Sequence, residues 1–485
     1  ILAIVLFDMI FAMRDITQTT HRIVVEAVRG KQETTLLAAK FERLARYDSL
    51  TGVENRMAMQ MRLRDLFEVD KRNRDALAIL WIDLDRFKEI NDSLGHIVGD
   101  ALLCAVVERL SLLLDGRGHL ARFGGDEFMI LCPNVNRTDA QQIARDIMTS
   151  LEQGVAAAGN ILHVTASIGI AVGPQDGREA DELMQHADLA LYEAKAKGRN
   201  QAMAFAWSMK ERFDRIHEIE TGLRNAIDRN ELVVKYQPIF DVESGRIAIC
   251  EALLRWNHPT LGVVSPGEFI PIAESTGAIE QITHWVIREA CRTAAQWPGE
   301  VRVAINISPA SMRTGELPSA VVAALMDSGL PARRLELEVT ESIFLHDDGQ
   351  THHMLRELRR IGLRLVLDDF GTGYSSLSYL RSYRFDGIKI DRSFMDGITT
   401  SPEDQAIVYA VGHLAEKLHM EIVAEGIETV DQLDYARRSG IHNVQGFLMA
   451  EPQPESVITD MVVRGMTIEG AIEAKAARKK AAARA

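Results

Sequence analysis

Short apolar runs that end near a polar or charged residue recur along two stretches of this 485-residue chain. In the first stretch, residues 76–84 read ALAILWIDL, residues 119–132 form two runs around a Gly-Gly pair, and residues 161–172 read ILHVTASIGIAV. Helical patterns lie between these runs. Buried strands are apolar and are bounded by turn residues. The pattern therefore predicts one α/β domain over residues 48–205, with a hairpin at 119–132 and one strand at 161–172.

The second stretch repeats the alternation of apolar run and helix eight times between residue 219 and residue 452. The runs are YQPIF, CEALLRW, VRVAINIS, LELEVTES, LRLVLDDFG, DGIKIDRSF, EIVAEGIET and NVQGFLMA. This rhythm and length are typical of a TIM-like β/α barrel, in which the polar strand ends gather at one catalytic rim. We therefore expect a barrel domain at 219–465, joined to the first domain by a helical linker at 206–218.

The two ends of the chain have their own patterns. Residues 1–13 are apolar apart from Asp8, but a membrane span takes about 20 residues. Two interpretations stay open: the cytoplasmic end of a truncated membrane helix, or the last strand of a removed sensor domain. A seven-residue spacing from Ile16 to Leu44 predicts a signalling or coiled-coil helix, so residues 1–47 are expected to be a membrane-proximal segment. The basic, Ala-rich residues 466–485 are expected to form a tail without an assigned role.

Composition narrows the class of protein. Apolar residues make up 47% of the chain and charged residues 26%, which is the balance of a soluble globular protein. The net charge of −14 argues against binding to a nucleic-acid polymer, because phosphate neutralisation needs a basic surface. The four cysteines (Cys104, Cys132, Cys250 and Cys291) lack metal-ligand spacing, which indicates reduced thiols in the cytosol.

The first candidate chemical centre is RFGGDEF at 122–128, in the predicted hairpin turn. Gly124 and Gly125 let the backbone approach a ligand and adopt dihedrals that a Cβ would block. Asp126 and Glu127 follow directly, and Asp83 ends the apolar run before them. Carboxylates around one pocket suit Mg²⁺, which bridges protein oxygens to substrate phosphates.

Four segments around this centre carry a family resemblance. DSLTGVENR, IDLDRFKEINDSLGHIVGD, RFGGDEF and ADLALYEAKAKGRNQ cover nearly all of 48–201 and resemble the GGDEF family of diguanylate cyclases. The resemblance implies that Asp83 and Asp126 hold one or two Mg²⁺ or Mn²⁺ ions with GTP, with Glu127 adjoining them, and that Asp126 and Glu127 are catalytic. It also implies substrate contacts from Asn91 and Asp100 at the guanine edge, Gly124 and Gly125 in the turn, and Lys88, Lys195 and Arg199 at the triphosphate.

The chemistry of condensation fits this resemblance. The 3′-oxygen of one GTP must attack the α-phosphate of another, which takes charge neutralisation and in-line positioning. An acid on the metal or its bound water could take the proton, and the sequence leaves both open. Each domain holds one GTP, so two domains must face each other. The sequence therefore predicts a homodimer brought together by the upstream helix.

The second candidate centre lies at the predicted rim of the barrel. Its oxygen-bearing candidates are Glu251, Asn306, Glu338, Asp368, Asp369 and Glu425, with Lys389 as the single lysine among them. Asp368 and Asp369 are adjacent after the run LRLVL. Two buried neighbouring carboxylates repel each other unless cations or protons intervene.

Motifs in the barrel stretch resemble the EAL family of cyclic-di-GMP phosphodiesterases over residues 218–455. They are YQP, EALLRW, NIS, ELEVTES, DDFGTGYSS, KID, AEGIE and QG. The resemblance implies two Mg²⁺ or Mn²⁺ ions held by Glu251, Asn306, Glu338, Asp368, Asp369 and Glu425, with Asp368 shared and Lys389 orienting or deprotonating a water. Two such ions, about 3.5–4 Å apart, ionise water and stabilise the leaving oxygen. The resemblance also assigns substrate-contacting or site-lining positions to Gln237, Arg255 and Gln445, while Glu251, Glu425 and Lys389 are expected to be catalytic.

Three interpretations of function compete. The first is a bifunctional enzyme that makes cyclic-di-GMP from GTP and hydrolyses it to pGpG under an upstream sensor. The second is a phosphodiesterase with a regulatory, GTP-binding GGDEF domain, and the third is a non-catalytic cyclic-di-GMP receptor. None of the matched ligands is missing, which argues against the receptor. In the first two, cytoplasmic catalytic domains are expected to be tethered to the inner membrane.

Two smaller expectations complete the sequence analysis. The loop DDFGTGYSS is rich in Gly and Ser, and we expect it to couple domain pairing to metal occupancy. His352 and His353 are expected to lie on an exposed helix rather than to bind a metal.

Overall fold

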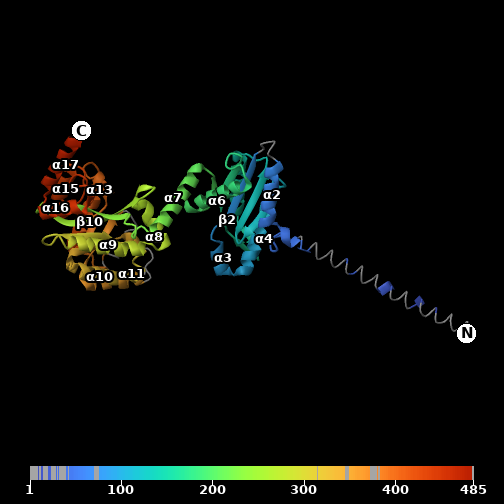
Figure 1. Ribbon diagram of the computed structural model, residues 1–485, viewed down its shortest axis with the longest axis horizontal. Coiled ribbons are helices and arrows are strands. Elements are labelled where there is room, and N and C mark those ends of the chain that lie inside the picture. The colour runs from blue at the N-terminus through green and yellow to red at the C-terminus, as the bar shows by residue number, and fades with distance from the viewer. Residues whose placement is uncertain are drawn as a thin grey trace. The chain divides into compact units, whose positions relative to one another are not determined.

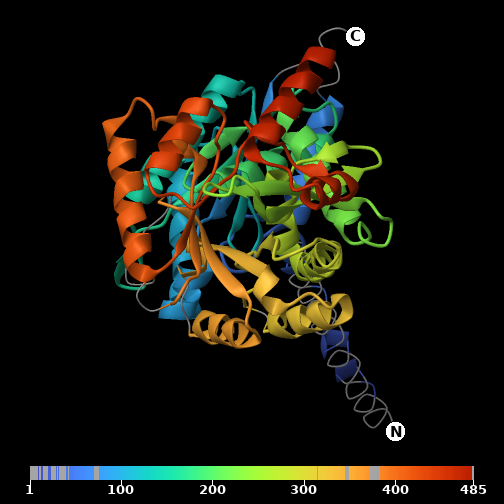
Figure 2. The ribbon, with the colours of Figure 1, turned by 90° about the vertical axis from the view of Figure 1, so that its left-hand side faces the viewer.

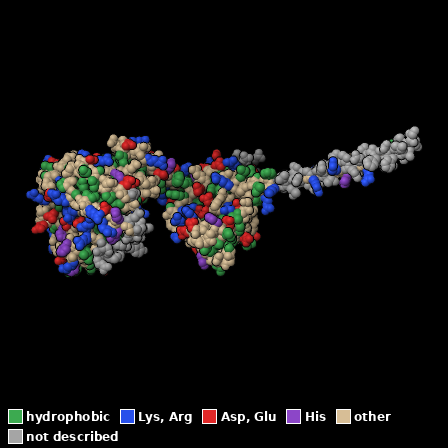
Figure 3. Space-filling model, turned by 90° about the horizontal axis from the view of Figure 1, so that it is seen from below, with side chains coloured by type: hydrophobic (Ala, Val, Ile, Leu, Met, Phe, Trp, Pro, Cys, Tyr) green, Lys and Arg blue, Asp and Glu red, His purple; other side chains and the backbone are tan. Residues whose placement is uncertain are grey.

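The computed structural model describes residues 43–69, 76–313, 315–344, 349–371, 380 and 383–482, with isolated positions before residue 43. The chain divides into two compact units, Ile1–Arg215 and Ile216–Ala485 (Figure 1). The signalling helix predicted over residues 1–47 lies almost wholly outside the described residues. Within the residues that are described, no helix has the length and apolar character needed to cross a bilayer. On the face shown in Figure 3, acidic and basic side chains are mixed over both units.

The first unit is built on a six-stranded sheet with the order β1-β3-β4-β2-β7-β8. Its strands are β1 (Glu54–Asn55), β2 (Leu77–Leu84), β3 (His119–Gly124), β4 (Glu127–Pro133), β7 (Ala166–Gly173) and β8 (Ala202–Ala204). Its helices are α2 (Arg56–Val69), α3 (Phe87–Leu94), α4 (His96–Leu114), α5 (Arg137–Glu152) and α6 (Ala180–Ala196). Helix α7 (Trp207–Leu223) covers all but the first residue of the linker predicted at 206–218.

Helices cover both faces of this sheet. Leu80 and Ile82 of β2 pack with residues of α4 and α5, whereas Ile79 packs with residues of α2 and α6. Successive strand residues point to opposite faces, so a strand covered on both sides must be apolar throughout. This explains why the run at 76–84 shows no alternation.

One predicted strand is divided in the structure. Residues 161–172 were expected to form a single strand, but β6 (Asn160–Leu162) pairs with β5 (Val155–Ala157) in a separate hairpin, and β7 begins only at Ala166. Ala158 and Gly159 both have positive φ, which suits the two-residue turn of that hairpin. The apolar run therefore belongs to two different sheets.

The second unit is a closed barrel of eight strands. They are β9 (Leu232–Asp241), β10 (Ile247–His258), β12 (Arg302–Asn306), β13 (Leu335–Thr340), β14 (Arg364–Phe370), β15 (Gly387–Ile390), β16 (Glu421–Ala424) and β17 (Asn443–Val444). Strands β10, β12, β13, β14, β15, β16 and β17 are parallel, and β9 closes the ring antiparallel to both β10 and β17. The TIM-like barrel predicted from the sequence is confirmed, with one reversed strand.

Helices surround the barrel (Figure 2). They are α8 (Pro266–Thr276), α9 (Ile279–Ala294), α10 (Leu317–Ser328), α11 (Gln350–Ile361), α13 (Arg392–Asp396), α14 (Pro402–Leu418), α15 (Val430–Arg438), α16 (Glu455–Val463) and α17 (Ile468–Ala482). The last of them occupies much of the predicted tail. Ile468 and Ala471, one helical turn apart, are buried in the barrel's hydrophobic core, so this part of 466–485 is packed.

The inward-facing side chains of the barrel form three layers. The lowest is charged (Arg302, Glu336, Arg364 and Glu421), the middle is apolar (Ile249, Ala304, Val366 and Val423), and the upper carries Glu251, Asn306, Glu338, Asp368, Lys389 and Glu425. Residues two apart on a strand share a face, so Ile249, Ala304, Val366 and Val423 each lie two positions before a residue of the upper layer, whereas Glu336 of the charged layer lies two positions before Glu338. The strands therefore present the candidate site to the inside of the barrel rim.

The lowest layer yields a stability prediction. Glu336, whose side chain is 3% exposed, has its Oε1 2.9 Å from Arg302 Nη1 and 2.9 Å from Arg364 Nε. Removing one member of a buried charge pair costs about 3–5 kcal/mol, whereas an exposed pair contributes about 0–1 kcal/mol. In urea unfolding, Glu336→Ala should lose several kcal/mol, while Glu300→Ala, which breaks the exposed pair with Arg333, should change little. Equal effects of the two substitutions would contradict this assignment.

Candidate functional site

The barrel site is organised around one buried lysine. Lys389 of β15 has a side chain only 1% exposed, and its ammonium faces four carboxylates. The distances from Nζ are 2.6 Å to Glu425 Oε1, 3.0 Å to Glu338 Oε2, 3.5 Å to Glu251 Oε2 and 3.6 Å to Asp368 Oδ1. One positive charge against four potential negative charges leaves a buried excess of negative charge, which favours protons or further cations.

Burial dominates the acid–base behaviour of this group. It raises the pKa of Glu425 to about 7, and it raises the pKa values of Glu338 and Asp368 although Lys389 attracts their charges. Burial also raises the pKa of Asp369, with the neighbouring Asp368 adding to the shift. For Lys389 burial acts in the opposite direction, but the surrounding carboxylates outweigh it and hold its pKa well above the ordinary value.

Glu251 is the carboxylate that the protein keeps ionised. Burial pushes its pKa upward, but Lys389 and hydrogen bonds from Gln445 and Asn306 together bring the pKa below its ordinary value. Asn306 Nδ2 and Gln445 Nε2 each donate to one of its oxygens at 2.6 Å. Because the amide nitrogen of Asn306 donates to Glu251, its amide oxygen is oriented away from Glu251 and can accept from or bind another partner.

A bulge at the end of β14 sets the two adjacent aspartates. The pairing of β14 with β15 shifts register between Leu367 and Phe370, and Asp369 has a φ of 53°, in the left-handed region. The backbone N–H of Asp369 donates to Asp368 Oδ1 at 2.9 Å. Bulges of this kind re-aim side chains beside active sites. Most of the loop DDFGTGYSS (368–376) lies outside the described residues. Its predicted role, the coupling of domain pairing to metal occupancy, stays a prediction from the sequence.

The predicted substrate positions lie beside this cluster. Gln237 of β9 is opposite Glu251 in the strand pairing, and its Nε2 donates to the carbonyl of Ala450 at 3.1 Å. Arg255 lies four residues beyond Glu251 on the same face of β10 and is half-buried. Gln445 has a buried side-chain oxygen that forms no hydrogen bond in the described structure. These groups give the rim donors and acceptors that a polar ligand could use.

The donor set fits divalent metal ions. Mg²⁺ and Mn²⁺ prefer oxygen ligands, and carboxylates and amide oxygens of this kind converge at the rim. Glu338, Asp368, Asp369 and Glu425 supply carboxylates, and Asn306 supplies the amide oxygen left by its contact with Glu251. Metal charge would also compensate the buried negative charge that raises the pKa values of these acids.

The site of the first unit centres on Asp83. Asp83 at the end of β2 pairs in register with Glu127 at the start of β4, and Lys195 of α6 places its Nζ 2.6 Å from Asp83 Oδ2. Burial raises the pKa of both carboxyls, and mutual repulsion contributes to the shift of Glu127. Gly124 and Gly125 have positive φ, and an added Cβ on either would meet nothing within 4 Å. The turn therefore leaves open space beside the acids.

The remaining predicted contacts surround this centre. Lys88 and Asn91 lie on α3, Asp100 lies on α4, and Arg199 follows α6 with a φ of 63°. A Cβ on Gly99 would come within 2.0 Å of Asn91 Oδ1, so the glycine lets this amide lie against α4 beside Asp100. Lys88, Asp100 and Arg199 are exposed, and within the described residues no hydrogen bond or ion pair joins them to the acids.

Sequence reasoning missed Asp85. Its carboxylate is buried and accepts hydrogen bonds from Thr165 Oγ1 at 2.8 Å, Ser167 Oγ at 2.7 Å and the backbone N–H of Asn200 at 3.0 Å. It ties β2 to β7 and to the turn that carries Arg199. The two acids in IDLD were visible in the sequence. Only the hydrogen-bond partners in the structure show that Asp85 positions backbone segments, whereas Asp83 faces the candidate site.

Both parts of the chain match known protein families. The chain matches the family model "Diguanylate cyclase, GGDEF domain" over residues 45–201 and the model "EAL domain" over residues 220–452. It is 40% identical over 428 residues to the cyclic di-GMP phosphodiesterase NbdA of Pseudomonas aeruginosa, covering 87% of this chain and 55% of that protein. It is 38% identical to the bifunctional diguanylate cyclase/cyclic di-GMP phosphodiesterase MucR of the same organism, covering 89% of this chain and 64% of that protein.

The chain is also similar to a solved structure of the MucR phosphodiesterase in complex with c-di-GMP. It is 39% identical, with a TM-score of 0.48, and the match covers 50% of this chain and 99% of that one. The fold and the paired sites define a class in which a nucleotide-cyclase-like unit precedes a phosphodiesterase-like barrel. The chain belongs to the family of tandem GGDEF–EAL proteins. It spans about half to two thirds of the length of the first curated relatives that it matches.

Proposed function

We propose that the barrel hydrolyses cyclic-di-GMP to linear pGpG. The observation that carries this proposal is the buried ammonium of Lys389 within 3.6 Å of four carboxylates on the inner rim of the barrel. Such a centre can bind divalent metal and manage the proton of an attacking water. The relatives NbdA and MucR, both named as cyclic di-GMP phosphodiesterases, support the choice of substrate.

The polar residues of the barrel rim have separate roles in this proposed reaction. Two Mg²⁺ or Mn²⁺ ions would be held by Glu251, Asn306, Glu338, Asp368, Asp369 and Glu425. Bound metal of this kind supplies a water acidic enough to attack and charge that stabilises the leaving oxygen. Lys389, which keeps its proton, orients that water and stabilises negative charge at the reacting phosphate. Burial raises the pKa of Glu425 to about 7 in the absence of metal, and a bound ion would lower that pKa again, so Glu425 would act as an ionised ligand.

Substrate binding falls to residues around that centre. The Arg255 guanidinium can grip a phosphate through two parallel N–H groups, which a lysine could not do. Gln237 and Gln445 offer side-chain amides at the same rim, and the unsatisfied oxygen of Gln445 is suited to a ligand donor. These contacts would place the scissile phosphate over the carboxylate cluster.

The proposal extends to the first unit, which we infer condenses two GTP molecules to cyclic-di-GMP. Asp83, Asp126 and Glu127 would hold Mg²⁺ or Mn²⁺ with the triphosphate, and Lys195, already near Asp83, would contact phosphate oxygens. Asn91 and Asp100 would read the guanine edge, while Lys88 and Arg199 are exposed and able to reach phosphates. Each copy of the first unit would hold one GTP, so the reaction requires a homodimer. The membrane tether and the upstream sensor stay predictions from the sequence.

Product analysis tests both activities. The chain is incubated with Mg²⁺ and either GTP or cyclic-di-GMP, and the nucleotides are separated by chromatography. We expect pGpG from cyclic-di-GMP in the parent protein and in Asp126→Ala, but not in Glu251→Ala. From GTP, cyclic-di-GMP should accumulate in Glu251→Ala and be absent in Asp126→Ala. If GTP speeds hydrolysis but is not condensed, the first unit is a regulatory GGDEF domain rather than a cyclase. If the parent protein forms no pGpG from cyclic-di-GMP, the proposed phosphodiesterase activity is refuted.

A further inference from the structure

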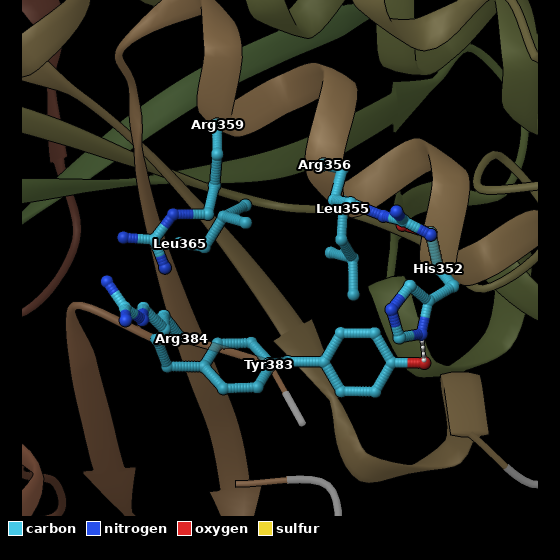
Figure 4. Close-up of a pocket in the computed structure, with 8 residues that line it drawn as sticks. His352, Leu355, Arg356, Arg359, Leu365, Tyr383 and Arg384 are labelled. Atoms are coloured by element: carbon cyan, nitrogen blue, oxygen red, sulfur yellow. Dashed lines mark hydrogen bonds between the residues drawn. The ribbon is translucent and has the colours of Figure 1, made fainter. Parts of the chain in front are cut away.

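A cavity of about 250 Å³ lies on the outside of the barrel strands, between α11 and the segment that leads into β15 (Figure 4). Its lining residues are His352, Leu355, Arg356 and Arg359 of α11, Leu365 of β14, and Tyr383, Arg384 and Phe385 before β15. None of them belongs to the candidate sites described above. His352, expected to be exposed, is half-buried in this wall, whereas His353 is exposed.

Positive charge dominates the lining. Arg356 and Arg384 have no carboxylate partner among the described residues, and Arg359 has a single one, with its Nη2 3.7 Å from Asp386 Oδ1. Asp386 is itself engaged, because its other oxygen accepts from the backbone N–H of Leu365 at 2.9 Å. Arg359 Nη1 is buried and has no hydrogen-bond partner in the described structure. Among the residues that the structure describes, three arginines face one shared carboxylate, so this part of the lining is net positive on a chain whose net charge is −14.

The arginines are arranged to share a ligand. Figure 4 shows the guanidinium groups of Arg359 and Arg384 on the same side of the cavity, coming from different elements. Like charges held together are stabilised by an anion between them, and the guanidinium fork matches phosphate oxygens. The buried Arg359 nitrogen without a partner would gain one from such an anion.

The rest of the wall is largely aromatic. Tyr383 Oη lies 2.8 Å from His352 Nδ1, their rings are 4.6 Å apart, and the ring of Phe344 packs 5.0 Å from Tyr383 on the core side. Phe385 and Leu355 add apolar surface. A preformed aromatic surface beside guanidinium groups suits a planar ring that carries a phosphate.

The volume limits the size of the ligand. Pockets for drug-sized ligands measure roughly 300–1,000 Å³, so a cavity of about 250 Å³ fits a smaller molecule than a cyclic dinucleotide. We propose that this cavity is a second ligand site that binds a nucleoside monophosphate, with its phosphate between Arg359 and Arg384 and its base against Tyr383.

The position of the cavity connects it to the catalytic rim. Leu365 is three residues before Asp368 on β14, and Tyr383 to Phe385 lead directly into β15, which carries Lys389. A ligand here would contact β14, which carries Asp368, and the segment that leads into β15, which carries Lys389. The site is therefore placed to adjust the geometry of the rim without entering it.

Calorimetric titration of the full chain with GMP tests the site. EDTA in the buffer suppresses metal-dependent nucleotide binding at the two candidate centres. The variants are Arg384→Ala, which removes a guanidinium that has no carboxylate partner in the described part of the chain, Arg384→Lys, which keeps the charge, and Arg360→Ala as the control. Arg360 lies on the same helix outside the cavity and pairs with Glu357. Circular dichroism verifies that each variant is folded.

We expect GMP to bind the parent protein and Arg360→Ala equally, Arg384→Lys more weakly, and Arg384→Ala at least tenfold more weakly than the parent. Inorganic phosphate and guanosine, titrated separately, should each bind more weakly than GMP. The proposal is overturned if the parent protein does not bind GMP, or if Arg384→Ala binds it as the parent does. Phosphate binding as tight as GMP binding would overturn the nucleotide assignment, because the aromatic wall would then contribute nothing.

Discussion

Lys389→Met is expected to lower the rate of cyclic-di-GMP hydrolysis by about 10²–10³-fold, the usual cost of removing one preorganised group that stabilises negative charge in the transition state. Methionine preserves the length of the side chain but removes the ammonium that lies 2.6 Å from Glu425 and 3.0 Å from Glu338. The water and the reacting phosphate would then lose the positive charge that orients and stabilises them. Initial rates of pGpG formation at saturating Mg²⁺ measure the effect.

The same substitution should also reveal how the buried charges are balanced. Without Lys389 the four carboxylates have no buried cation, and leaving charges unpaired in this way costs about 3–5 kcal/mol. In EDTA the variant should therefore unfold at lower urea concentration than the parent, and excess Mg²⁺ should reduce the difference. Lys417→Met removes an exposed lysine of α14 as the matched control and should change neither rate nor stability. Unchanged hydrolysis by Lys389→Met would remove the lysine from the mechanism.

The pattern of apolar runs and helices along the chain was enough to predict the folds of both units and most residues of the candidate barrel site. The barrel strands were visible because each is an apolar run followed by polar groups, and period-two alternation explains why Glu251, Asn306 and Glu425 share the inner face. The reversal of β9 was not visible. A run such as YQPIF specifies a strand but not its direction, and direction depends on the short connection to β10 at 242–246.

Partners across the fold were also hidden from the sequence. Nothing local to Glu336 indicates that Arg302 and Arg364, on two other strands, converge on it beneath the active rim. The same holds for the cavity beside α11, because His352 and Tyr383 are 31 positions apart in the chain. Residue types and spacing identify candidates for chemistry, whereas the closing of the barrel decides which of them meet.

Asp83→Asn is expected to abolish the formation of cyclic-di-GMP from GTP while the unit stays folded. The carboxylate is the proposed metal ligand at the end of β2, and the amide of similar shape removes its charge. Burial raises the pKa of Asp83, so its ionised form costs stability, and the neutral side chain should not lower the unfolding temperature. The loss of the contact with Lys195 is small, because that lysine is 34% exposed and screened by water.

Asp85→Ala provides the contrast, since Asp83 and Asp85 are buried to the same degree, at 8% and 7% exposure. Asp85 accepts hydrogen bonds from Thr165, Ser167 and Asn200, and each buried donor left without an acceptor costs about 1–3 kcal/mol. Its loss should lower the unfolding temperature and impair activity through folding. Both variants are best measured in Glu251→Ala, where cyclic-di-GMP accumulates. If Asp83→Asn instead destabilised the unit and kept the activity of its folded fraction, Asp83 would be a structural residue and the metal would be held elsewhere.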